Sequence, residues 1–167
     1  MVALGSCAPA EPTCGHTGYG SLSHNLDSSG LPRDPVTEAD MNAQPEAHLL
    51  LPGATDMHGP LGMGECKDLF TGLQEVYIDD DFLTSGSVDN AYAYYRAHLM
   101  ARGWQSAGGV VQSGGDFSSY QTFTRGSREW FVVRVYTSPG WQSTWATPIP
   151  AGSTAMSTDF TIAPASP

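Results

Sequence analysis

The sequence predicts an α+β domain in which one helix packs on a mostly antiparallel sheet of about four strands, giving a two-layer sandwich. Three observations support this class: an amphipathic helix pattern over residues 88–102, two alternating segments around a short turn at 125–128, and a last alternating segment near the C-terminus. With 167 residues, the chain is long enough for one domain and a tail.

The helix pattern has a start signal, an apolar stripe and a stop signal. Ser87 can cap the helix through its hydroxyl group, and Gly103 favours the left-handed conformation that ends a helix. Between them, apolar residues recur at spacings of four, three and four: Val88, Tyr92, Tyr95 and Leu99. This spacing places them on one side of the helix, which must be buried. We expect Trp104 to fold back onto that side.

The sheet is expected to contain a first strand over residues 73–82, a hairpin of 120–124 with 129–137, and a final strand around Phe160. In the second hairpin strand, alternation places Phe131, Val133 and Val135 on one face and Trp130, Val132, Arg134 and Tyr136 on the other. This alternation on both sides of the turn indicates a hairpin.

Four parts follow one another along the chain. Residues 1–7 are interpreted as the remnant of an export signal, 8–47 as an irregular tether without apolar periodicity, 48–163 as the α+β domain and 164–167 as a short tail. Leu4-Gly5-Ser6-Cys7 resembles a bacterial lipobox, in which the cysteine is acylated. The residues before Cys7 are too few for a whole export signal, so we expect the natural chain to begin upstream of Met1.

Cysteine counting is consistent with export. The chain has three cysteines, and assigning Cys7 to a lipid leaves Cys14 and Cys66 to form a disulfide. The alternative is three free thiols in a reducing compartment. A zinc site at Cys14, His16 and His24 is a further alternative, but the second half of a ligand pattern is missing.

Charge and motifs exclude several functions. Seventeen acidic residues against seven basic ones give a formal charge of -10, which argues against nucleic acid as a partner. No Gly-x-Ser-x-Gly segment occurs, and the glycines of 108–115 lack the Lys-Ser/Thr of a phosphate loop. Asp79-Asp80-Asp81 is interpreted as a solvated strand end, with calcium binding as the weaker alternative. We therefore predict no catalytic residues, no cofactor and no metal.

Aromatic residues are the candidate contacts with a partner. Trp141 and Trp145 lie within a loop predicted over 138–153, where exposed indoles favour contact with a partner protein or glycan. The alternative is that one or both fold onto the open face of the sheet beside Tyr136. Tyr94 falls outside the buried helix stripe and is the third candidate.

One longer resemblance covers about residues 49 to 137. Leu51-Pro52-Gly53-Ala54, the helix Tyr94-Tyr95-Arg96 to Gly103-Trp104 and the following hairpin resemble uncharacterised lipoproteins of high-GC Gram-positive bacteria. This resemblance implies an exported domain tethered by lipid on Cys7 at the outer face of the cytoplasmic membrane or in the cell wall. We expect a non-enzymatic domain that binds or supports another envelope protein or glycan. The alternative is an accessory subunit or weak hydrolase whose site is not visible in sequence.

Overall fold

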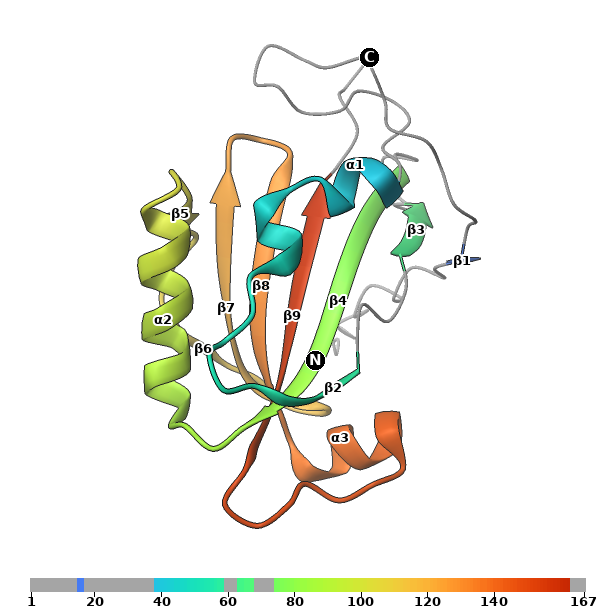
Figure 1. Ribbon diagram of the computed structural model, residues 1–167, viewed down its shortest axis with the longest axis vertical. Coiled ribbons are helices and arrows are strands. Elements are labelled where there is room, and N and C mark those ends of the chain that lie inside the picture. The colour runs from blue at the N-terminus through green and yellow to red at the C-terminus, as the bar shows by residue number, and fades with distance from the viewer. Residues whose placement is uncertain (1–14, 17–37, 59–62, 68–73, 163–167) are drawn as a thin grey trace, which may run out of the picture.

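The computed structural model describes residues 15–16, 38–58, 63–67 and 74–162, which form an α+β fold around one antiparallel sheet. The strand order is β1-β3-β4-β9-β8-β7-β5, with β2 paired to β4 and β6 paired to β7. The long strands β4 (Gln74–Thr84), β9 (Thr154–Ile162), β8 (Glu129–Tyr136) and β7 (Phe117–Arg125) lie side by side at its centre (Figure 1). The short strands are β1 (Gly15–His16), β2 (Thr55–His58), β3 (Met63–Lys67), β5 (Gln105–Ser106) and β6 (Val111–Gln112).

Helices lie on both faces of this sheet. The helix α2 (Val88–Met100), with α1 (Glu38–Asn42) and the 3-10 helix η1 (Pro45–His48), lies in front of the sheet in Figure 1. The helix α3 (Ser138–Trp145) packs at one end of the opposite face. The predicted α+β class and antiparallel sheet are confirmed, whereas the finer description of one helix on about four strands is too simple. We call the two surfaces of the sheet the α2 face and the α3 face.

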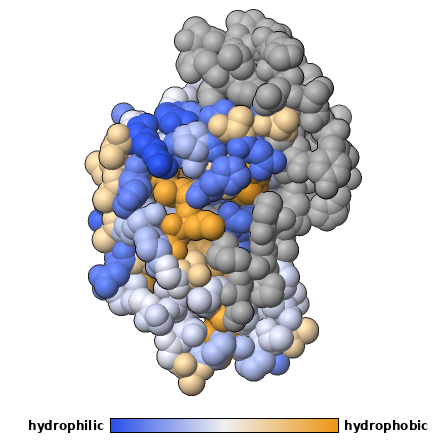
Figure 2. Space-filling model, viewed as in Figure 1, coloured by the Kyte–Doolittle hydropathy of each residue, from blue (hydrophilic) through white to orange (hydrophobic). Residues whose placement is uncertain are grey.

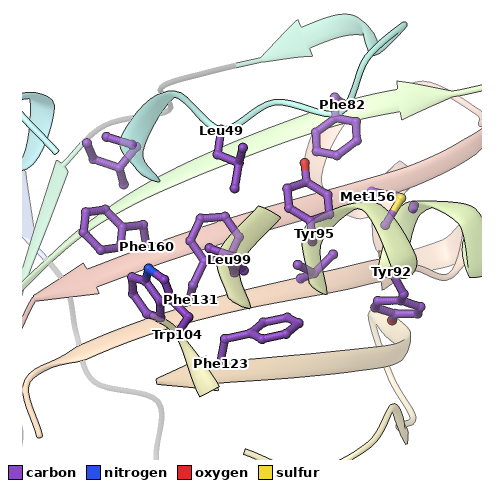
Figure 3. Close-up of a cluster of buried hydrophobic side chains, with 14 of the residues drawn as sticks. Leu49, Phe82, Tyr92, Tyr95, Leu99, Trp104, Phe123, Phe131, Met156 and Phe160 are labelled. Carbon is purple, nitrogen blue, oxygen red and sulfur yellow. The ribbon is translucent and has the colours of Figure 1, made fainter. Parts of the chain in front are cut away.

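The main core fills the α2 face. Apolar side chains from α2 and the four long strands meet there, as Figure 3 shows for Leu99, Phe131 and Phe160. The Tyr95 and Phe131 rings lie 5.8 Å apart, and the Trp104 ring stands edge-on to Phe131 at 6.2 Å. Most of the helix stripe expected from the sequence is buried, because Tyr92, Tyr95 and Leu99 are each at most 3 % exposed, whereas Val88 in the first turn is partly buried.

The cap at Ser87 and the stop signal at Gly103 form at the two ends of α2 as the sequence predicts. The Asn90 amide donates to the Ser87 hydroxyl at 3.2 Å, which caps the N-terminus. At the other end the amide of Trp104 donates to the Leu99 carbonyl at 3.1 Å, and Gly103 has a φ of +85°. These features turn Trp104 back onto the core, and the helix ends at Met100 rather than at the predicted Arg102.

Part of the predicted tether belongs to the folded domain. Met41 in α1 is fully buried, and so is the side chain of Glu46 in η1. Glu46 accepts hydrogen bonds from the Trp104 indole at 3.1 Å and from the Arg125 guanidinium at 3.1 Å. The packed domain therefore starts before residue 48, because a buried carboxylate with a charged partner fixes this segment to the sheet.

The predicted loop at 138–153 contains the helix α3. Thr137 caps it by accepting a hydrogen bond from the Gly140 amide at 3.1 Å, and Pro139 occupies its first turn. Gly140 is buried against the segment before β7, and a β-carbon there would lie 2.2 Å from the Asp116 carbonyl oxygen. Glycine is required at this position because two backbone segments approach so closely.

Candidate functional site

The candidate lipid and disulfide cysteines fall largely outside the described residues. Cys7 and Cys14 are not among them, and Cys66 lies in β3, where its backbone pairs with Glu75 of β4. No disulfide is seen within the described ranges. In the same ranges, no helix has both the length and the apolar character needed to cross a membrane.

The two loop tryptophans differ in burial. Trp141 is 1 % exposed and packs with Leu83 and Ala155 in a small second core on the α3 face. Trp145 is partly buried at the edge of this core, and its ring lies 6.0 Å from that of Trp141. Both indoles fold beside Tyr136, which was the alternative to an exposed contact surface. Trp141 therefore offers no surface to a partner while α3 is docked, whereas Trp145 offers a partial one.

Tyr94 lies on the other side of the molecule. Its hydroxyl group donates to the Leu50 carbonyl at 2.9 Å, and its ring stacks on His98 at 4.0 Å. Leu50, beside it, is 38 % exposed. From this side the surface is mainly polar, with a small apolar area in its middle (Figure 2). Tyr94 is thus partly buried and already hydrogen-bonded, and it does not lie next to Trp145.

A cluster of charged residues occupies the middle of the α3 face, and the sequence did not predict it. Asp79 and Asp81 point to this face from β4, and Asp80 is buried on the opposite face. The interpretation of these residues as a solvated strand end was wrong, because β4 runs on to Thr84 and pairs with β9 along its length. We call Asp79, Asp81, Asp159 and Arg134 the carboxylate cluster.

Asp159 is the best-paired acid of the carboxylate cluster. It lies directly opposite Asp79 in the register of β4 and β9. Arg134 donates to its Oδ2 at 3.0 Å, and the Thr161 hydroxyl donates to its Oδ1 at 2.8 Å. The Oδ1 atom of Asp79 is buried and has no hydrogen-bond partner. The two facing carboxyl groups therefore have very different environments.

Asp81 attaches α3 to the sheet. Its Oδ2 accepts hydrogen bonds from the Tyr136 hydroxyl at 2.9 Å and from the Trp145 indole at 3.0 Å. Both donors also belong to the small second core, so a single carboxylate connects that core to the carboxylate cluster. Such hydrogen bonds to a charged acceptor are stronger than neutral ones.

Burial dominates the electrostatics of this face. Desolvation, followed by the nearby charge of Asp159, raises the pKa of Asp79 to about 8. Desolvation also raises the pKa of Asp81, although the hydrogen bonds from Tyr136, Ser157 and Trp145 oppose that shift. The pKa of Tyr136 is raised by burial and by the Asp81 carboxylate. A protonated Asp79 beside an ionised Asp159 is the state that these environments favour.

Outside the carboxylate cluster, the described part of the chain offers a cleft but no metal site. Within the described ranges, no group of three or more His, Cys, Asp or Glu side chains is arranged to hold a metal ion. A cleft of about 240 Å³ lies at the start of α2, between Gly53 and Thr84. Polar groups that line the cleft already form hydrogen bonds within the chain. The Thr84 hydroxyl accepts a hydrogen bond from the Gly86 amide, and the Ser87 hydroxyl caps α2. This cleft gives no sign of a particular ligand.

No known family matches the chain. The comparison with curated proteins and the comparison with solved structures found no match either.

One sequence signal could have revealed part of the site. Thr137 followed by Pro139 is a typical helix start and would have predicted α3. No such signal exists for the Asp79 and Asp159 pair, because the two residues are far apart in the chain and meet only through the pairing of β4 with β9.

Proposed function

We propose that this protein is a non-enzymatic domain tethered outside the cytoplasmic membrane, and that it binds another envelope component through the α3 face. The supporting observation is the alternation of burial along β8, where every second residue from Glu129 to Val135 is buried while Trp130, Val132 and Arg134 stay partly exposed. Among the described elements, α3 alone packs on this face, and it covers only one end. Partly exposed aromatic and charged side chains suit contact with a protein or a glycan.

Site-specific photo-crosslinking in the cell envelope tests this proposal. A photoreactive residue at Val132 reports on the α3 face, and one at the exposed Ala97 of α2 is the matched control. We expect a discrete crosslinked partner from position 132 and none from position 97. Crosslinks of equal yield from both positions, or none from position 132, contradict the proposal.

The tether is proposed to be a lipid on Cys7. Metabolic labelling with a fatty-acid probe in cells that carry the whole gene tests it, with Cys7→Ser as the variant and Cys14→Ser as the control. We expect the label and the membrane fraction to be lost only in Cys7→Ser. Label that persists in Cys7→Ser excludes this attachment site.

A disulfide between Cys14 and Cys66 is also proposed. A lipid on Cys7 would leave these two cysteines to pair with each other in the oxidising environment outside the membrane. Non-reducing peptide mapping of the exported protein should give one linked peptide, and two free thiols would rule the bond out.

A weak hydrolase or an accessory subunit is the second candidate, and one observation favours the hydrolase. A neutral Asp79 beside an ionised Asp159 is the kind of pair that performs general acid and base catalysis. Turnover of chromogenic ester or glycoside substrates that disappears in Asp79→Asn, with the fold intact, would favour this candidate over binding.

A further inference from the structure

Asp79 and Asp159 together accept fewer hydrogen bonds than two buried, ionised carboxylates require. Asp159 has a donor on each oxygen, from Arg134 and from Thr161. Asp79 has a buried oxygen without any partner. An ionised carboxylate accepts hydrogen bonds at both oxygens, and a buried one without donors is costly. The hydrogen-bond pattern therefore assigns the negative charge to Asp159 and a proton to Asp79.

The surrounding charges lead to the same assignment. Asp159 faces Asp79 from β9, Asp81 and Tyr77 flank it on β4, and Arg134 approaches from β8. Farther groups are Tyr136 on β8 and Asp80 on the other face. Among the side chains that the structure describes, one guanidinium thus serves three carboxyl groups on this face. Like charges directly opposite each other on paired strands are destabilising, which favours retention of one proton.

The proton on Asp79 affects α3 through Asp81. The two aspartates lie two residues apart on the same face of β4, and both are drawn to Arg134. Asp81 is also the acceptor for Trp145 of α3 and for Tyr136, which packs against Trp141 at 5.5 Å. A charge on Asp79 would compete for Arg134 and bring water into the cluster next to these bonds.

We propose that α3 is a pH-sensitive latch: Asp79 is protonated in the folded protein at neutral pH, and its ionisation in mildly alkaline solution loosens the contact of α3 with the sheet. Burial first, and the Asp159 charge second, raise the pKa of Asp79 to about 8, which is consistent with this latch. A role of this latch in regulating binding at the α3 face rests on the binding function proposed above. The test of the latch itself needs no binding partner.

Fluorine NMR of the protein labelled with 5-fluorotryptophan tests the latch directly. The four tryptophans give separate reporters, and Trp145→Phe identifies the Trp145 signal. Between about pH 6 and about pH 9.5, we expect the Trp145 signal to shift with a midpoint near the Asp79 pKa, while the Trp104 signal stays constant. The pKa values of Tyr77 and Tyr136 are raised by burial, so neither phenol titrates in this range.

Variants separate the latch from a general alkaline effect. Asp79→Asn should abolish the Trp145 titration, whereas the exposed Asp116→Asn should keep it. Asp159→Asn removes the charge that faces Asp79 and should lower the midpoint of the Trp145 titration by about one pH unit or more. This second variant tests the latch even if Asp79→Asn folds poorly. A Trp145 signal that does not respond to pH, or that responds equally in Asp79→Asn, overturns the latch. The NMR experiment uses the protein without any partner, so a negative result would overturn the latch without contradicting the binding proposal, which the crosslinking experiment tests.

Discussion

The α2 face and the α3 face of this sheet come from the same strands but are stabilised differently. Alternate residues of β8 supply Phe131, Val133 and Val135 to one face, and Val132 and Arg134 to the other. On the α2 face, aromatic and aliphatic side chains fill an interior that excludes water. On the α3 face, buried and partly buried carboxyl groups share one guanidinium, and a small apolar cluster lies at one end of the face.

This difference shows which face supplies stability and which can respond to its surroundings. Removal of apolar surface from water is the main favourable contribution to folding, and the α2 face holds most of that surface. Buried carboxyl groups contribute little net stability, but their protonation depends on pH. Mutations on the α2 face should therefore unfold the molecule, and changes on the α3 face should alter local structure or pH dependence.

The largest effect is expected from Leu99→Ala. Leu99 is fully buried under α2, so the truncation loses its burial and leaves a cavity. We expect the free energy of unfolding to fall by about 2–5 kcal/mol, measured by urea denaturation. The neighbouring Met100, which is 54 % exposed, gives the control Met100→Ala with a change within about 0.5 kcal/mol. A loss below about 1 kcal/mol for Leu99→Ala would contradict the assignment of stability to this face.

Arg125→Ala tests the charged edge of the α2 face. Arg125 donates to Glu46 and to Glu129, whose side chains are at most 3 % exposed, and it stacks on Trp104 at 4.8 Å. Without it two buried carboxylates lose their cation, so we expect a loss of about 3 kcal/mol at neutral pH. Arg102→Ala, at an exposed position, is the control, and equal losses in the two variants would refute the network.

Gly140→Ala tests whether the α3 face has an independent local structure. A β-carbon at this position meets the Asp116 carbonyl oxygen at 2.2 Å, so α3 or its neighbour must move. We expect a loss of about 1–3 kcal/mol, with altered near-ultraviolet circular dichroism of the α3 tryptophans and an unchanged helix signal from α2. The exposed Ser143→Ala is the control. Unchanged tryptophan signals would show that the close contact is easily relieved.

The most gradual effect is the pH dependence of stability, which is small between neighbouring pH values and accumulates over several pH units. The folded-state pKa of Asp79 lies above its unfolded value, so its stabilising contribution is complete in acid, falls as pH rises from about 4, and is lost at about 8. We expect ionisation of Asp79 to lower the free energy of unfolding by about 1 kcal/mol per pH unit in this window. A difference of one whole bound proton between the folded and unfolded states would give about 1.4 kcal/mol per pH unit, and the effect is smaller here because water reaches part of the cluster. Urea denaturation across this range should give a flatter profile for Asp79→Asn, and identical profiles would remove Asp79 as the cause.

Local patterns explain why some elements were predicted and others were not. The helix α2 has its cap at Ser87, its stop at Gly103 and its apolar stripe within one short segment. The hairpin of β7 and β8 is likewise formed by neighbouring residues around a turn. By contrast, the short strands β2 and β3 have no strong alternation and form only because β4 offers its edge to both.

The sequence alone determined the α+β class, the helix α2, the hairpin and the alternation of side chains along β8, because each depends on contacts between near neighbours. Only the tertiary structure decided that the first long strand lies next to the last one, which brings Asp79 opposite Asp159. It also decided that Met41 and Glu46 are buried in the folded domain and that Trp141, in α3, is buried against the sheet. These features depend on contacts between distant segments, where burial and strand pairing outweigh local preference.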